Sequence, residues 1–161
     1  MAFNAYLRLQ GERQGEIKGS VTQKGREGRI MVFAASHSIE SPWDPDSGLP
    51  IGKRRHEPFV ITKEVDKSTP LLYTMLVNNE TISEWELQFW QPSPTGTEVN
   101  HYTVKLTNAN IASIDFTMPD NKDPNLMKRA EYEEIAFTYQ NIQWTWNDGG
   151  ITTFDDWISR A

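Results

Sequence analysis

The sequence predicts a mainly β protein, folded as a small β-barrel or as two packed antiparallel sheets, with one short α-helix and a long extended loop. Apolar and polar residues alternate along about eight segments, which is the period of a half-buried strand. One stretch shows helical spacing, and another is rich in proline and glycine. A chain of 161 residues is long enough to bury its own core, so we expect a single domain over residues 1–161.

The first part of the chain predicts several strands joined by polar, glycine-containing connections. Residues 18–23 and 29–37 read as two short strands of a hairpin around the turn at 24–28. Residues 56–62 read as a further strand, with Pro58 near its start. The opening strand places one apolar face toward the core through Phe3, Ala5, Leu7 and Leu9.

Residues 38–55 (SIESPWDPDSGLPIGKRR) predict an extended loop, because proline lacks the ladder donor and glycine weakens strands. Loops of this length inside a compact domain often carry function. Trp43 lies within this loop, where a domain of this size offers it little shelter, and tryptophan is enriched at interfaces. We therefore expect another subunit or a partner to bury Trp43.

The one predicted helix begins near Ser68 and ends near Asn78. Ser68 and Thr69 offer a hydroxyl N-cap, and Pro70 suits the first helical position. Leu72, Met75 and Leu76 share one face. A helix of about ten residues is too short to hold alone, so we expect its apolar stripe to cover an open barrel end or a sheet edge.

The remaining chain again predicts strands, over 83–91, 100–107, 111–118 and 128–146. The alternation slips by one near Gln140 and Asn141, which indicates a β-bulge. Residues 147–161 are mixed, with Phe154 and Trp157 as candidate anchors. Three tryptophans lie in phase with apolar neighbours and are expected in the core: Trp85, Trp144 and Trp146.

Composition excludes several protein classes. There is no cysteine, hence no disulfide, thiol nucleophile or thiolate metal site. No apolar run approaches the ~20 residues of a membrane span, and residues 1–20 lack the apolar segment of a secretory signal. Residues 1–63 carry a formal charge of +3 and residues 64–161 carry −9. This polarity suits head-to-tail contact between copies, whereas the acidic total opposes nucleic-acid binding.

No catalytic, cofactor or metal motif is present, so we predict a binding or assembly protein and no enzyme. Glu131, Glu133 and Glu134 are expected to form one solvated strand face. Two alternatives remain open. One is a carbohydrate-binding β module with exposed aromatics. The other is a small hydrolase that uses His37, His56 or His101.

The stretch from Gly52 to Leu72 resembles the haemolysin-coregulated protein (Hcp) family, the tube protein of bacterial type VI secretion. The shared pattern is a Gly-Lys pair, a histidine, a strand ending in Thr-Lys, and an Asp-x-Ser-x-Pro helix start. Here these residues are Gly52-Lys53, His56, Thr62-Lys63, Asp66, Ser68 and Pro70. The strand order and the lone helix extend the resemblance over nearly the whole chain.

The resemblance implies a small β-barrel of two packed antiparallel sheets, and hexameric rings that stack into a hollow tube. It also implies sheath proteins, a spike protein at the tip and small effectors in the lumen as partners. Assembly in the cytoplasm would precede export without a cleavable signal peptide. Candidate residues for subunit or ring contacts are Ser41, Trp43, Asp44, Lys53, Arg54, Arg55 and His56.

Overall fold

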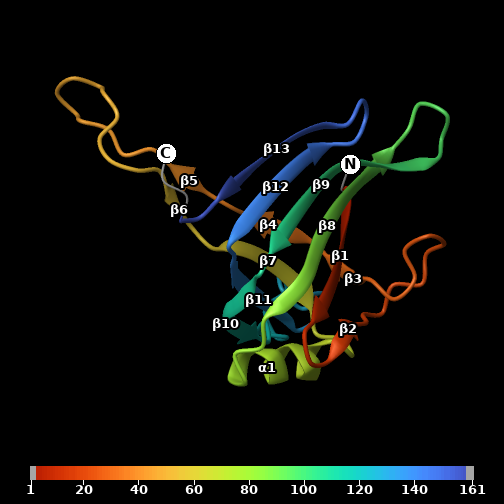
Figure 1. Ribbon diagram of the computed structural model, residues 1–161. Helices are drawn as coiled ribbons and strands as arrows, with labels where there is room; N and C mark the ends of the chain where they lie inside the picture. Colours follow the sequence, from red (N-terminus) through yellow and green to blue (C-terminus); the bar gives the residue numbers. More distant parts are fainter. Residues whose placement is uncertain (1–2, 159–161) are drawn as a thin grey trace.

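The computed structural model describes residues 3–158 and confirms a mainly β fold with one α-helix in that range (Figure 1). The strands are short in several places, so the segments outnumber the predicted eight. They are β1 (Asn4–Gly11), β2 (Gly15–Ile17), β3 (Ile30–Val32), β4 (Ala34–Ser36), β5 (Ile39–Glu40), β6 (Arg55–His56), β7 (Phe59–Glu64), β8 (Ile82–Pro92), β9 (Glu98–Thr107), β10 (Asn110–Thr117), β11 (Tyr132–Thr138), β12 (Asn141–Trp146) and β13 (Ile151–Asp156). The helix α1 spans Thr69–Val77.

Two antiparallel sheets enclose the core. The larger sheet has the order β13-β12-β9-β8-β1-β2, with β3 also paired to β1. The second sheet has the order β10-β11-β7-β4, and β5 and β6 form a separate two-stranded ribbon. The inward faces of both sheets supply the buried apolar cluster, which includes Leu7, Trp85, Leu106, Ile61 and Phe137. Alternation with period two therefore identifies Ala5, Leu7 and Leu9 of β1 as buried, but Phe3, expected on the same face, precedes the strand and is exposed.

The predicted helix is confirmed in position and in its buried face. Leu72 and Met75 are buried, and α1 lies across the lower end of the two sheets in Figure 1, next to β10. Ser68 is the N-cap residue, but its side chain makes no cap hydrogen bond. Instead the Ser68 hydroxyl and the Ser68 backbone N–H both donate to the Asp66 carboxylate, so the cap prediction is wrong in that detail.

The chain crosses between sheets at places where the sequence predicts continuous strands. Residues 29–37 split at Phe33, with β3 in the larger sheet and β4 in the smaller one. At 138–141 the chain leaves β11 and enters β12 of the other sheet, so the slip near Gln140 is a crossing and not a bulge. At the second crossing the buried positions change from odd residue numbers, such as Phe137, to even ones, such as Ile142. A phase slip alone therefore does not distinguish it from a bulge.

Two further strand predictions need correction. Residues 18–23 form no strand, although Gly19 and Val21 exchange backbone hydrogen bonds with Gly28 and Arg29 as a hairpin would. Residues 56–62 are divided by the stretch around Pro58, with β6 in the small ribbon and β7 in the second sheet. Proline cannot donate to a ladder, which accounts for the interruption.

The aromatic predictions hold in part. Trp85 is buried and Trp144 is half-buried against the core, but Trp146 is exposed. Of the two candidate anchors in the tail, Trp157 packs against the core and Phe154 is exposed. Residues 159–161 of that tail lie outside the described part of the chain. No helix within residues 3–158 is long and apolar enough to cross a membrane.

Candidate functional site

The extended loop forms a projecting arm, defined as residues 41–54. It leaves the body at the end opposite α1, as the orange-to-yellow segment of Figure 1 shows. Strands β5 and β6 pair at its base, with Ile39 opposite His56 and Glu40 opposite Arg55. Trp43 and Pro50 form a second antiparallel bridge further out. The arm is therefore an ordered, long hairpin.

Asp44 organises the tip of the arm. Its carboxylate accepts hydrogen bonds from the Asp46 backbone N–H at 3.0 Å and from the Ser47 hydroxyl at 3.1 Å. Its backbone carbonyl accepts the Gly48 N–H at 2.7 Å. Gly48 has φ +73°, a conformation that glycine adopts without steric cost. These bonds hold the turn, so the flanking side chains have defined positions.

The arm presents large apolar side chains to solvent. Trp43 is 62% exposed, Leu49 64% and Ile51 53%. Burying such surface yields roughly 25 cal/mol per Å², and exposed apolar groups gathered on a projection are typical of contact sites. The single chain leaves Trp43 unsheltered, as the loop composition predicts, and its burial by a partner stays a prediction. Leu49 and Ile51 were not singled out from the sequence, although both interrupt a polar, proline-rich loop.

An ion pair anchors the base of the arm to β13. The Arg54 guanidinium donates two hydrogen bonds to the Asp155 carboxylate, and the one from Nη2 to Oδ1 measures 2.7 Å. Nη2 also donates to the Asp156 carbonyl at 3.1 Å. This side-chain hydrogen bond from Arg54, aided by one from His56, lowers the pKa of Asp155 to about 2. Asp155 therefore stays ionised at any pH near neutrality.

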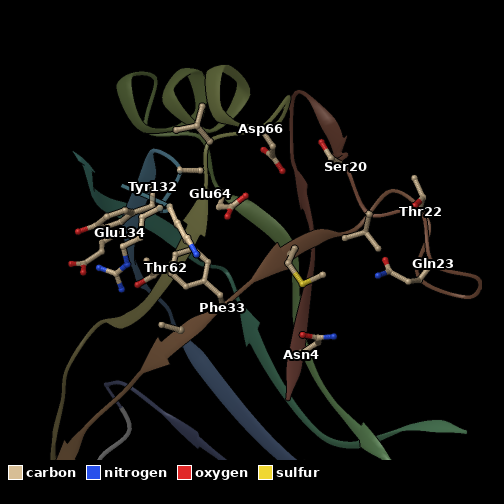
Figure 2. A pocket seen from close by; sticks show the side chains of 17 residues that line it. Asn4, Ser20, Thr22, Gln23, Phe33, Thr62, Glu64, Asp66, Tyr132 and Glu134 are labelled. Carbon is tan, nitrogen blue, oxygen red and sulfur yellow. The ribbon is translucent and has the colours of Figure 1, made fainter. Parts of the chain in front are cut away.

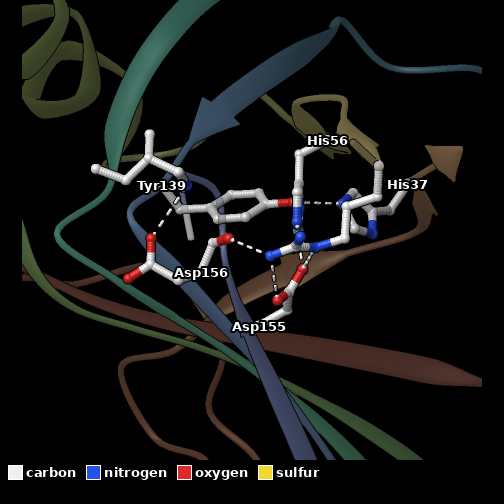
Figure 3. A network of polar contacts seen from close by, with 7 residues as sticks. His37, His56, Tyr139, Asp155 and Asp156 are labelled. Atoms are coloured by element: carbon white, nitrogen blue, oxygen red, sulfur yellow. Dashed lines mark hydrogen bonds and ion pairs between the residues drawn. The ribbon is translucent and has the colours of Figure 1, made fainter. Parts of the chain in front are cut away.

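A chain of hydrogen bonds continues from Asp155 into the core (Figure 3). His56 Nε2 lies 2.7 Å from Asp155 Oδ2, and His56 Nδ1 lies 2.7 Å from the Tyr139 hydroxyl. His37 Nε2 lies 2.8 Å from the same hydroxyl. Burial lowers the pKa of His37, and the nearby His56 lowers it further. Burial also raises the pKa of the Tyr139 hydroxyl, with a smaller contribution from Asp155.

The structure divides the predicted contact residues into two groups. Trp43 and Arg55 are solvent-exposed, and Arg55 pairs with Glu40 at 2.8 Å. Arg54 and His56 point inward and bind within the chain. The remaining members lie on the arm, half-buried for Asp44 and exposed for Ser41 and Lys53.

Sequence reasoning missed Asp155 and Tyr139 and saw His37 only as a hydrolase candidate. These residues meet across separations of 83 to 102 positions. Residues so far apart in the sequence form no local motif that could have identified them.

A pocket lies elsewhere, between the 18–29 connection, β3, β4, β7 and β11 (Figure 2). It encloses about 1100 Å³. Phe33 and Tyr132 pack edge-to-face at 6.4 Å in its wall. Its charged lining combines Glu64, Asp66, Glu134, Lys128 and Arg129. The pocket contains none of the three histidines, so it does not have the arrangement that the hydrolase alternative requires.

One buried acid corrects an earlier expectation. Glu133 does not lie on a solvated face with Glu131 and Glu134: its side chain is fully buried beside Lys63. Adjacent strand residues point to opposite sides of a sheet, so Glu133 and Glu134 cannot share one face.

Comparison with known proteins identifies the family. The family model described as "Type VI secretion system effector, Hcp" matches residues 6–146. The major exported protein of Pseudomonas aeruginosa strain PAO1 is 37% identical over 168 aligned residues, which cover 99% of this chain and 98% of that protein.

Solved structures agree with this assignment. A crystal structure of an Hcp protein matches with a TM-score of 0.91 at 28% identity, covering 99% of this chain and 100% of that one. Hcp1 from the EAEC 042 pathovar of Escherichia coli matches with a TM-score of 0.86 at 33% identity, covering 97% of this chain and 99% of that one. The resemblance read from Gly52 to Leu72 is confirmed, and the chain belongs to the Hcp family of type VI secretion proteins.

Proposed function

We propose that the chain is a structural subunit of the type VI secretion tube, acting as one domain over its whole length. In this proposal six copies form a ring, rings stack into a hollow tube, and the lumen carries and chaperones small effectors. Sheath proteins surround the tube and a spike protein closes its tip. Family membership and the ordered arm with its exposed apolar side chains together support this proposal.

The arm is the observation that carries the proposal. Three large apolar side chains stand on a hairpin whose tip and base are both fixed by hydrogen bonds. Exposed apolar surface on such a projection favours association, so we interpret the arm as a contact site for another molecule. A contact made by one surface of a copy on a different surface of the next is heterologous, and repetition of that contact gives rings or filaments.

Charge polarity supports directional assembly. The chain has a basic first part and an acidic remainder. Two basic residues near the end of this first part are exposed: Lys53 lies on the arm and Arg55 lies at its base. Opposite potentials on two contacting surfaces steer association and disfavour the reversed orientation.

An export assay tests the proposed function. Deletion of the sheath gene in the source bacterium supplies the control strain. The proposal predicts that the protein accumulates in the cytoplasm of both strains but reaches the medium only when the sheath is present. Equal amounts in the medium of both strains, or none in either, would contradict export by the contractile machine.

A further inference from the structure

The two ends of the arm meet at a single hydroxyl group. His37 lies just before β5, and His56 lies in β6, so the two histidines flank the arm along the chain. Both imidazoles reach the Tyr139 hydroxyl, at 2.8 Å and 2.7 Å. In Figure 3 the Tyr139 hydroxyl points toward His56 and His37, and Asp155 lies next to His56. The proton state of this cluster therefore decides how the base of the arm is held.

When both histidines are neutral, the available donors and acceptors determine which ring nitrogen of each histidine carries the proton. Ionised Asp155 only accepts, so His56 Nε2 carries a proton and donates to it. The His56 Nδ1 then has a free lone pair and accepts the Tyr139 O–H. The Tyr139 oxygen in turn accepts the N–H of His37 Nε2. Each of these three contacts then joins one donor to one acceptor.

One added proton is also accommodated. If it binds His56 Nδ1, that nitrogen donates to the Tyr139 oxygen, and the Tyr139 O–H turns to His37 Nε2. His37 then carries its own proton on Nδ1 instead of Nε2. The positive charge on His56 is matched by Asp155 at 2.7 Å. No hydrogen bond is lost.

A second proton cannot be accommodated. Both imidazolium rings would then donate to the one Tyr139 oxygen, and the Tyr139 hydrogen would lose its acceptor inside a buried site. Two imidazolium charges and Arg54 would also face one carboxylate. The aromatic rings packed against the two imidazoles are uncharged: Phe59 and Trp144 lie against His37, and Trp157 lies against His56. The carboxylate of Glu57, the residue after His56, pairs with Arg55.

We propose that His37, His56, Tyr139, Asp155 and Arg54 form an acid-sensitive latch, which holds the arm while at most one histidine is protonated and releases its base when both are. The latch is a property of one chain. Its consequence for stacking, namely weaker contacts between rings at acid pH, rests on the proposed function.

The direction of the pH effect follows from the pKa shifts. Burial and the neighbouring His56 lower the pKa of His37 below its ordinary value of 6.5. When the base of the arm is released, His37 returns to its ordinary pKa and binds a proton more readily than in the latched state. A falling pH therefore favours the released state, and the latch holds less firmly at acid pH. The pKa of Asp155 is about 2, so this carboxylate stays charged throughout and is not the switch.

NMR measurements of backbone mobility test the latch. Amides of the arm are compared at about pH 8 and about pH 5 in dilute solution, with the strands of the larger sheet as internal reference. We expect amide exchange in the arm, corrected for its intrinsic pH dependence, to be faster at about pH 5 than at about pH 8. Exchange in β1 and β8 should stay unchanged.

Variants separate the latch from a general loss of stability. His56→Gln and His37→Gln each remove one of the two imidazoles that meet at the Tyr139 hydroxyl, so each should abolish the pH response of the arm. His101→Gln is the matched control, because His101 packs near Phe3 and Trp146, away from the cluster. It should retain the full response. Tyr139→Phe removes the shared hydroxyl and should loosen the arm at both pH values.

Two results would overturn the latch: an arm equally ordered at both pH values in the wild-type chain, or a pH response that survives in both His37→Gln and His56→Gln. Because the readout is motion within one chain, a monomeric protein with a pH-sensitive arm would contradict the proposed tube function and leave the latch standing. Stacked rings with a pH-insensitive arm would support the proposed tube function and contradict the latch.

Discussion

At the scale of single residues, a buried ion pair joins three elements. Lys63 on β7 and Glu133 on β11 are both 0% exposed, and Lys63 Nζ lies 2.6 Å from Glu133 Oε1. Nζ also reaches the Thr69 hydroxyl at the start of α1 and the Asp66 carboxylate. Removing two charges from water is costly. The Glu133 Oε1 atom offsets part of this cost by accepting from both Lys63 and Thr69, whereas Glu133 Oε2 has no hydrogen-bond partner among the described residues.

Breaking this pair on one side should be severe. Lys63→Met leaves the Glu133 carboxylate buried without its cation, and we expect the free energy of unfolding to fall by about 3–5 kcal/mol. Denaturant titration followed by circular dichroism measures the change. The double variant Lys63→Met with Glu133→Leu removes both charges and should recover most of the loss. A double variant no more stable than Lys63→Met would contradict this account.

At the scale of elements, local chemistry predicted some features well. The helix was predictable because Ser68, Pro70 and the Leu72/Met75 spacing lie within ten residues of one another. The core faces of β1 and β8 were predictable because alternation is also local. The crossings at Phe33 and at 138–141 were not, since the destination of a strand depends on sheets built from distant segments.

The site shows the same limit more sharply. The sequence identified the arm and the exposure of Trp43, because proline, glycine and an unsheltered tryptophan occur together in residues 38–55. It gave Arg54 and His56 a contact role without revealing that both bind Asp155 in the same chain. Whether they also take part in contacts between copies stays a prediction.

The arm also supplies a mutational prediction. Trp43→Ala should leave the fold intact, because Trp43 is 62% exposed, but weaken stacking by about 2 kcal/mol, roughly thirtyfold in dissociation constant. Sedimentation velocity over a range of concentrations measures the change. Phe154→Ala is the matched control, since Phe154 is 70% exposed but lies on β13, outside the arm. Stacking equal in both variants would reject the role of Trp43.

At the scale of the whole molecule, the modest hydrophobic content, 37% of residues, and the uneven charge have one explanation in the proposed tube. A ring subunit has an inner wall, an outer wall and two end faces, so much of its surface stays wet or meets polar partners. The basic first part and the acidic remainder give each copy a direction. Exposed ion pairs are weak and screened, so salt should affect stacking more than folding.

The central claim is that this chain assembles into rings through its own surfaces. Negative-stain electron microscopy of the purified protein tests it most directly. We predict annular particles with sixfold symmetry and a central opening, with a mass by light scattering of six times the 18.5 kDa of one chain. A uniform population of compact 18.5 kDa monomers at high protein concentration would contradict the account.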